Sequence, residues 1–248
     1  MSDESKVDRR DFLKAGVAGA AAVALGSGTA EAEPAYDRDA HNWGYMVDLT
    51  ACIGCGACVR ACSAENDVPD NFFRTWVERY TFTRDGKVHV DSPDGARNGF
   101  KSDPEGVDPE TVTKSFFVPK LCNHCVQSPC VQVCPVGASY ETKDGVVLVD
   151  RNHCIGCGYC IQACPFGCRF LNPKGYADKC TLCYHRITKG LPPACVEACP
   201  VGARQAGNMK DPNSPIRKLL DTSRFGVLKP DLGTHPKVYY VGLDAEVI

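Results

Sequence analysis

Apolar and polar residues alternate over several short stretches of the chain, and residues that favour turns stand between these stretches. Residues 43–50, WGYMVDLT, predict a short strand. Residues 74–92, RTWVERYTFTRDGKVHVDS, predict two strands joined by a turn at Asp85-Gly86. Residues 139–153, SYETKDGVVLVDRNH, predict another hairpin around Asp144-Gly145. Short strands and hairpins are therefore expected in both halves of the chain.

Three further segments give different patterns. Residues 92–110, SPDGARNGFKSDPEGVDPE, are rich in Gly, Pro and Asp and predict a loop. Near the C-terminus, residues 216–223, IRKLLDTS, predict a short helix, and residues 237–243, KVYYVGL, predict a strand. The 248 residues are enough for one large or two small domains.

The N-terminal residues have the pattern of an export signal. Arg9 and Arg10 precede Phe12 and Leu13, and a weakly hydrophobic run rich in Ala and Gly follows over residues 15–30. This pattern is typical of a twin-arginine signal peptide. A transmembrane anchor is the alternative, but the run is shorter than the roughly 20 strongly apolar residues that a spanning helix needs.

We therefore expect residues 1–32 to be a twin-arginine signal peptide with a cleavage site at Ala30-Glu31-Ala32. The mature chain would begin near Glu33 and would be periplasmic. The twin-arginine route exports folded proteins, so a metal cofactor can be inserted in the reducing cytosol before export. No later stretch approaches the length of a spanning helix.

Cysteine is the unusual feature of the composition, with 17 residues in a chain of formal net charge −2. The charge gives no indication of nucleic-acid binding. Sixteen of the cysteines fall into four blocks, and Cys168 is left over. In chain order the blocks are Cys52, Cys55, Cys58 and Cys62; Cys122, Cys125, Cys130 and Cys134; Cys154, Cys157, Cys160 and Cys164; and Cys180, Cys183, Cys195 and Cys199. Disulfides, zinc ribbons and iron–sulfur clusters are the three interpretations that compete.

The spacing of the first and third blocks is C-x2-C-x2-C-x3-C. In bacterial ferredoxins with this spacing, the first three cysteines bind one cluster and the fourth binds a second. We expect the fourth cysteine to stand at the start of a short helix. Gly54 and Gly56 suit a loop that approaches a cluster closely. A proline follows the fourth cysteine in every block except the first, which has Ser63 at that position.

The two alternatives fit this spacing less well. Zinc ribbons use two C-x2-C pairs separated by a longer span, and the triple spacing of the first and third blocks does not match that arrangement. Neighbouring C-x2-C pairs would form small, strained disulfide rings and would leave an odd cysteine. The spacing favours iron–sulfur clusters, and Cys168 is expected to be a buried or half-buried free thiol.

With these blocks, the chain resembles the four-cluster iron–sulfur subunits of the dimethyl-sulfoxide-reductase family. The resemblance also rests on CSAEN at 62–66, PKLCNHC at 119–125, CVEACPVGA at 195–203 and LKPDLGTHPKVYY at 228–240. The last segment is similar to the polysulfide and tetrathionate reductase branch. The resemblance covers nearly all of the mature chain. It is specific for cofactor content and weak for substrate.

The resemblance implies four 4Fe–4S clusters, each held by cysteines from two blocks. The expected ligand sets are Cys52, Cys55, Cys58 and Cys199; Cys62, Cys180, Cys183 and Cys195; Cys122, Cys125, Cys130 and Cys164; and Cys134, Cys154, Cys157 and Cys160. All sixteen ligand positions hold cysteine. We therefore expect no three-iron cluster.

The implied fold is α+β, with two tandem bacterial ferredoxin-like modules and an insert that contains a β-hairpin. Residues 33–62 and 165–207 would form an outer module, and residues 122–164 an inner module. Residues 63–121 would be the insert, and residues 208–248 a C-terminal docking tail.

The implied function is electron transfer in a periplasmic respiratory oxidoreductase. The expected partners are a molybdopterin-type catalytic subunit and a membrane quinone-reactive subunit. The alternative is a membrane redox complex that has a cytochrome partner and lacks the molybdenum subunit. The sequence offers no general base, nucleophile or substrate pocket, so it does not predict independent catalysis. His124 lies between two expected ligands, where it could tune a cluster potential or simply pack.

Overall fold

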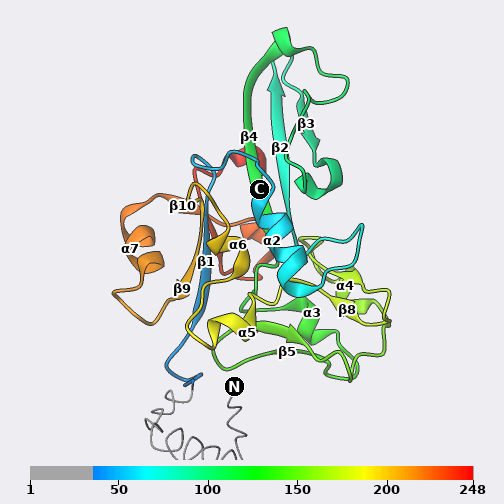
Figure 1. Ribbon diagram of the computed structural model, residues 1–248, viewed down its shortest axis with the longest axis vertical. Helices are drawn as coiled ribbons and strands as arrows, with labels where there is room; N and C mark the ends of the chain where they lie inside the picture. The colour runs from blue at the N-terminus through cyan, green and yellow to red at the C-terminus, as the bar shows by residue number, and fades with distance from the viewer. Residues whose placement is uncertain (1–35, 248) are drawn as a thin grey trace, which may run out of the picture. The chain divides into compact units, whose positions relative to one another are not determined.

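The computed structural model describes residues 36–247, which form one compact unit (Figure 1). The expected signal peptide and its cleavage site lie outside the described residues. In the part that is described, no helix has both the length and the apolar character needed to cross a membrane.

One sheet joins the two ends of the described chain. Its strands stand in the order β10 (Phe225–Gly226), β11 (Val238–Val241), β1 (Trp43–Asp48) and β9 (Arg204–Asn208). β1 runs parallel to β11 and antiparallel to β9. The predicted strands at β1 and β11 are confirmed. β9 was not predicted, because its sequence RQAGN has neither alternation nor β-branched residues.

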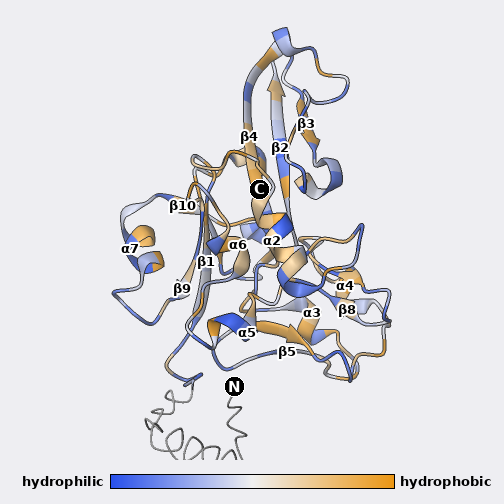
Figure 2. Ribbon diagram, viewed as in Figure 1, coloured by the Kyte–Doolittle hydropathy of each residue, from blue (hydrophilic) through white to orange (hydrophobic). Residues whose placement is uncertain are grey.

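A second sheet forms an arm that projects from the body of the molecule (Figure 1). Its strands stand in the order β3 (Val88–Asp91), β2 (Thr75–Thr83) and β4 (Val112–Leu121). Figure 2 shows that the arm strands carry both hydrophilic and hydrophobic residues, and buried residues largely alternate with half-buried ones along β2. The predicted β2–β3 hairpin is confirmed. β4 was not predicted, since it contains Pro119, but as an edge strand it tolerates a proline.

Between the arm strands, the predicted loop at 92–110 is confirmed apart from two short 3-10 turns, η1 (Pro93–Ala96) and η2 (Pro109–Thr111). The predicted hairpin around Asp144-Gly145 is also confirmed, as β5 (Ser139–Glu141) and β6 (Val147–Val149). A pair of two-residue strands, β7 (Phe170–Leu171) and β8 (Ala177–Asp178), is too short to leave a periodic pattern in the sequence.

Short helices accompany the cysteine blocks. A helix begins just before the third cysteine of each block, and a further helix follows Cys183. In order these helices are α2 (Ala57–Asn66), α3 (Pro129–Gln132), α4 (Tyr159–Gln162), α5 (Tyr184–Ile187) and α6 (Ala194–Glu197). The predicted C-terminal helix is confirmed as α7 (Pro215–Thr222), and two 3-10 turns, η3 (Pro230–Leu232) and η4 (Ala245–Val247), lie in the tail.

The expectation that the fourth cysteine stands at the start of a helix is wrong. Cys62 lies within α2, and the other three fourth cysteines follow the last residue of their helices. The cause is local, since Gly56 and Gly158 adopt left-handed conformations and start α2 and α4 directly before the third cysteine. The third and fourth cysteines are therefore separated by one helical turn.

The main core and the cysteines form one continuous cluster of buried residues. Tyr45, Val47, Val238 and Tyr240 of the central strands are at most 1% exposed. The same cluster contains cysteines of every block, among them Cys58, Cys122, Cys164, Cys180 and Cys195. A smaller cluster holds Cys130, Cys154 and Cys160. Most of the cysteines therefore lie in or beside the hydrophobic interior, whereas Cys157 is exposed.

The insert packs against the loop of the first block at two glycines, whereas the third block is closely packed at only one of the two equivalent positions. A Cβ built on Gly56 would lie 2.0 Å from the carbonyl oxygen of Ala96, and one on Gly54 would lie 2.7 Å from the ring of Phe117. A Cβ on Gly158, which occupies the position of Gly56 in the repeat, would meet open space. The insert therefore packs against both glycines of the first loop, whereas in the third block the β7–β8 turn covers Gly156 and Gly158 stays uncovered.

This difference gives a matched pair of variants. Gly158→Ala introduces only the left-handed conformation, which costs about 1–2 kcal/mol, or a fall in Tm of about 2–8 °C in a chain of this size. Gly56→Ala adds a collision with backbone atoms of the insert, and we expect it to lower Tm at least about twice as far. Thermal unfolding of the anaerobically purified protein, followed by circular dichroism, measures both. Equal falls in Tm would contradict the close packing of the insert.

Candidate metal centres

All 17 cysteines lie within residues 36–247, and none of them forms a disulfide bond. The prediction that Cys168 is a buried free thiol is confirmed, since it is 2% exposed. Its thiol donates a hydrogen bond to the carbonyl oxygen of Leu121, with a sulfur–oxygen distance of 3.0 Å. Cys168 is therefore held by the backbone, at the position of an ordinary core residue.

Twelve of the other cysteines line three separate cavities, four to each cavity. The first cavity is lined by Cys52, Cys55, Cys58 and Cys199. The second is lined by Cys62, Cys180, Cys183 and Cys195. The third is lined by Cys134, Cys154, Cys157 and Cys160. Each cavity draws on two blocks that are far apart in the sequence or separated by a hairpin.

The remaining four cysteines are also neighbours. Burial raises the pKa of Cys125 to about 12, and the charges of Cys122, Cys130 and Cys164 add to this effect. Cys130 is influenced by Cys122 and Cys164 as well. These four residues therefore lie near one another, and we group them as a fourth quartet. We number the quartets one to four as the groups that contain Cys52, Cys180, Cys122 and Cys157, respectively.

The quartets follow one another in a row. Cys58 and Cys62, one helical turn apart, belong to quartets one and two, and Cys195 and Cys199 link the same two quartets. Cys160 and Cys164 link quartets four and three in the same way, as do Cys134 and Cys130. The charge of Cys122 raises the pKa of Cys180, which places quartet three beside quartet two. The order along the row is therefore one, two, three, four.

A 4Fe–4S cluster requires four thiolate ligands around a cavity, and the quartets supply this donor set. Between Tyr36 and Val247, no three His, Cys, Asp or Glu side chains are placed to hold a single metal ion. The residues present therefore fit 4Fe–4S clusters.

Burial makes negative charge on these sulfurs costly. It raises the pKa of Cys180 to about 12, and it also raises the pKa values of Cys58, Cys62 and Cys195. Thiolates at these positions need compensating positive charge from bound iron and from nearby cations. Donors that stabilise sulfur are therefore part of the site.

Several such donors were not found by sequence reasoning. The Tyr45 hydroxyl lies 3.2 Å from the sulfur of Cys195, and Asn66 donates from its amide nitrogen to the sulfurs of Cys62 and Cys183, both at 3.6 Å. Arg169 donates to the sulfur of Cys130 at 3.0 Å. Asn66 lies in the segment CSAEN and Arg169 close to the third block, but the spacing of the cysteines says nothing about their orientation.

His124 is buried and accepts a hydrogen bond at Nδ1 from the backbone N–H of Val147, at 3.1 Å. Burial holds the pKa of His124 well below its usual value, so the ring is neutral. The contact with Val147 connects the second block to the β5–β6 hairpin.

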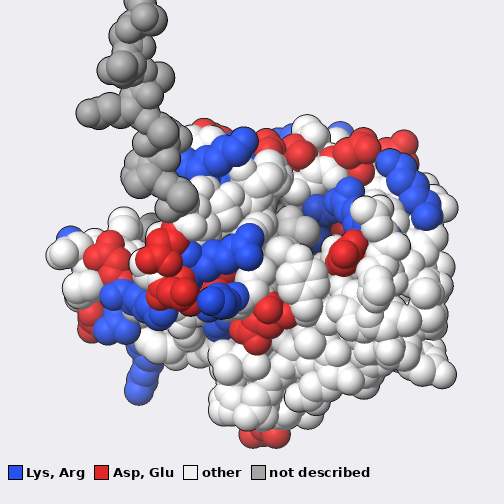
Figure 3. Space-filling view, turned by 90° about the horizontal axis from the view of Figure 1, so that it is seen from below, with Lys and Arg blue, Asp and Glu red and all other residues white. Residues whose placement is uncertain are grey.

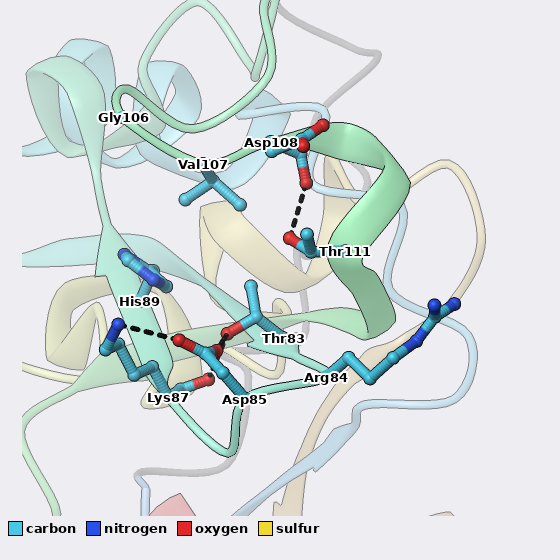
Figure 4. A pocket seen from close by; sticks show the side chains of 9 residues that line it. All are labelled: Thr83, Arg84, Asp85, Lys87, His89, Gly106, Val107, Asp108 and Thr111. Carbon is cyan, nitrogen blue, oxygen red and sulfur yellow. Dashed lines mark hydrogen bonds and ion pairs between the residues drawn. The ribbon is translucent and has the colours of Figure 1, made fainter.

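A further pocket lies near the β2–β3 turn of the arm, and it is lined by nine residues that include no cysteine (Figure 4). It is open, and its polar side chains bind one another, as Lys87 pairs with Asp85 at 2.6 Å. The cysteine quartets, not this cavity, carry the distinctive chemistry.

Comparison with known proteins supports the interpretation of the quartets. Two family profiles described as 4Fe-4S dicluster domain match residues 51–138 and 113–209. A profile for the twin-arginine translocation pathway signal sequence matches residues 6–26. The chain therefore carries four 4Fe–4S clusters in tandem ferredoxin-like domains, and the predicted export signal is confirmed.

Curated relatives cover most of the chain. A tetrathionate reductase subunit of Salmonella typhimurium is 44% identical over 207 residues, which are 82% of this chain and 74% of the relative. The corresponding tetrathionate reductase subunit of Archaeoglobus fulgidus is 48% identical over 80% of this chain and 81% of the relative. Protein NrfC of Escherichia coli is 40% identical over 94% of each chain. With these relatives and two dicluster domains, the chain belongs to the four-cluster iron–sulfur electron-transfer subunits of the dimethyl-sulfoxide-reductase family.

Proposed function

We propose that this chain relays electrons between a membrane quinone-reactive subunit and a molybdopterin catalytic subunit of a periplasmic respiratory oxidoreductase. The observation that carries the proposal is the row of four cysteine quartets, in which neighbours within each module are linked by single helical turns. The relatives named as tetrathionate reductase subunits support this class of complex.

In this proposal, each quartet holds one cluster with the ligands that the family resemblance implies. Quartet one is Cys52, Cys55, Cys58 and Cys199; quartet two is Cys62, Cys180, Cys183 and Cys195; quartet three is Cys122, Cys125, Cys130 and Cys164; and quartet four is Cys134, Cys154, Cys157 and Cys160. Each cluster supplies one-electron chemistry at a potential set by its surroundings. The protein orients the sulfurs and excludes water from the middle of the row.

The shared ligands support the proposed division of the chain. Quartets one and two use only cysteines from residues 33–62 and 165–207, the outer module, and β1 pairs with β9 across the same two segments. Quartets three and four use only cysteines of the inner module, residues 122–164. The insert, residues 63–121, contributes the whole arm sheet and no ligand.

Burial changes along the row in the way that an electron relay needs. All four cysteines of quartet two are buried, as are three of the four in quartet three. At one end of the row, Cys157 of quartet four is exposed, and at the other end three cysteines of quartet one are half-buried. Electrons can therefore enter and leave at the ends, while the middle is protected from solvent.

Exposed apolar side chains surround both ends. Ile53 and Val201, which line the cavity of quartet one, are 56% and 41% exposed. Ile155 and Tyr159 stand beside quartet four and are 64% and 58% exposed. Figure 3 shows that one face of the molecule has a broad area without charged side chains. We call the exposed apolar side chains beside each terminal cluster an apolar collar. Such apolar surface is suited to docking of one partner at each end.

A second architecture has a cytochrome partner in place of the molybdenum subunit. The match to Protein NrfC over 94% of both chains is the observation that favours it. Purifying the native complex and identifying its other subunits by mass spectrometry tests the proposal. A molybdopterin subunit together with a membrane subunit supports it, and a multihaem cytochrome without molybdenum would favour the second architecture.

Iron content and spectroscopy test the ligand sets. The anaerobic protein should contain about sixteen irons, four for each cluster. Cys157→Ser removes a ligand, and we expect it to lower the iron content by about one to four atoms and to change one of the four electron paramagnetic resonance signals. Cys168→Ser is the matched control and should keep all its iron, since Cys168 is bonded to a backbone carbonyl. Iron loss in Cys168→Ser with full content in Cys157→Ser would contradict the assignment.

Surface variants test the two docking ends. Ile53→Asp and Ile155→Asp each place a charge in an apolar collar and should weaken binding of one partner at least about tenfold. The two variants should affect different partners, and both should keep their full iron content. Pull-down of each partner from the purified complex measures the effect. Val90→Asp, at a 50% exposed position on the arm, is the control and should leave both interactions intact.

A further inference from the structure

Each pair of cysteine quartets contains one deeply buried arginine. Arg204 is 2% exposed and follows the fourth cysteine of its block in the sequence CPVGAR, residues 199–204. Arg169 is 5% exposed and follows the fourth cysteine of its block in CPFGCR, residues 164–169. The two arginines thus occupy the same position of the internal repeat, five residues after the cysteine.

Arg204 lies between quartets one and two. It lines the cavity of quartet one. Its Nη1 donates to the hydroxyl of Thr75 at 3.0 Å and to the hydroxyl of Tyr45 at 3.5 Å. Thr75 and Tyr45 both line the cavity of quartet two, and Tyr45 contacts the sulfur of Cys195. One guanidinium group therefore faces both quartets of the outer module.

Arg169 holds the equivalent place between quartets three and four. Its Nη2 donates to the sulfur of Cys130, in quartet three, at 3.0 Å. The same nitrogen donates to the hydroxyl of Ser139 at 2.8 Å, and Ser139 lines the cavity of quartet four. The inner module thus repeats the arrangement of the outer one with different supporting residues.

Neither arginine has a carboxylate partner among the residues that the structure describes. Two other buried cations have carboxylate partners, since Arg74 binds Asp178 at 2.8 Å and Lys237 lies 3.4 Å from Glu141. Buried Lys179 instead donates to the backbone carbonyl oxygens of Val147 and Cys180. In residues 36–247, Nη2 of Arg204 and Nη1 of Arg169 also lack a hydrogen-bond partner. A buried cation without a counter-charge is costly, so the anionic groups that balance it must come from the sites it faces.

We propose that Arg204 and Arg169 are positioning residues that hold one positive charge between the two clusters of each pair and so raise both reduction potentials of that pair together. Reduction adds one electron to a cluster and makes the site more negative. A fixed cation nearby favours that form, and low local dielectric strengthens the effect. The inference rests on the proposed ligand sets and adds residues that do not themselves bind iron.

The charge of each arginine should act on its own pair, because distance and intervening protein separate it from the other pair. Removing one arginine should therefore shift two of the four potentials and leave the other two in place. Two neighbours that shift together keep the same difference in potential, so the equilibrium of electron transfer between them is unchanged.

Redox titration of the anaerobic full-length protein, followed by electron paramagnetic resonance, tests this inference. Arg204→Met should lower the reduced-to-oxidised ratio of two clusters by at least about tenfold at a fixed potential, which is about 59 mV for a one-electron couple. Arg169→Met should have the same effect on the other two clusters. Arg204→Lys and Arg169→Lys keep the charge and should recover at least half of each shift. Should a methionine variant assemble fewer clusters, Arg204→Gln or Arg169→Gln replaces it.

Arg60 provides a matched control, since it belongs to the first block but is exposed to solvent. Arg60→Met should change every ratio by less than about twofold, because water screens its charge. Unchanged potentials in both methionine variants would overturn the inference, as would equal shifts in all four clusters or lysine variants that shift as far as methionine variants. A wild-type protein with far fewer than about sixteen irons would instead overturn the proposed function.

Discussion

The structure depends on sixteen cysteines, most of them buried or half-buried, which lie in quartets that draw on distant parts of the chain. Quartet one joins Cys52 to Cys199, and quartet two joins Cys62 to Cys180. The sheet repeats this closure, because β1 pairs with both β9 and β11. In the proposed ligand sets, iron would join the same distant segments that backbone pairing joins, so neither end of the described chain could separate without disturbing a cysteine quartet. Binding of iron is thus coupled to folding.

Much of this arrangement could be predicted from the sequence, because cysteine spacing and turn residues are local signals. The hairpins at Asp85-Gly86 and Asp144-Gly145 were predicted from their turn dipeptides. The four cysteine blocks were predicted from the spacing of the cysteines along the chain. The position of the fourth cysteine was predicted wrongly, since the helix start depends on the left-handed conformation of Gly56. β9 and the buried role of Arg204 could not be predicted, because both depend on what the distant strand β1 places beside them.

The two ends of the cluster row differ in spite of the sequence repeat. Ile53 and Ile155 occupy the same position of the repeated segment CIGCG, and both are exposed. Around the first end, however, Ala96 and Phe117 of the insert pack against the glycines of the loop, while the loop of the third block stays open beside Gly158. A repeat that folds into two similar modules would offer two similar ends. Because the insert packs at one end only, the two ends differ, and each partner can distinguish its own end from the other.

The residue five positions after each fourth cysteine explains why each pair of quartets holds one such arginine and not two. In the inner module this position is Arg169 after the third block and Ser139 after the second, and the serine hydroxyl accepts a hydrogen bond from the arginine. In the outer module it is Arg204 after the fourth block, while the first block has the exposed Asp67 there. Two guanidinium groups in one dry interior would repel each other and would compete for the same sulfurs. The repeat therefore places a cation in one half of each module and a neutral or solvent-facing residue in the other, so that the charge near each pair of clusters is fixed by the fold.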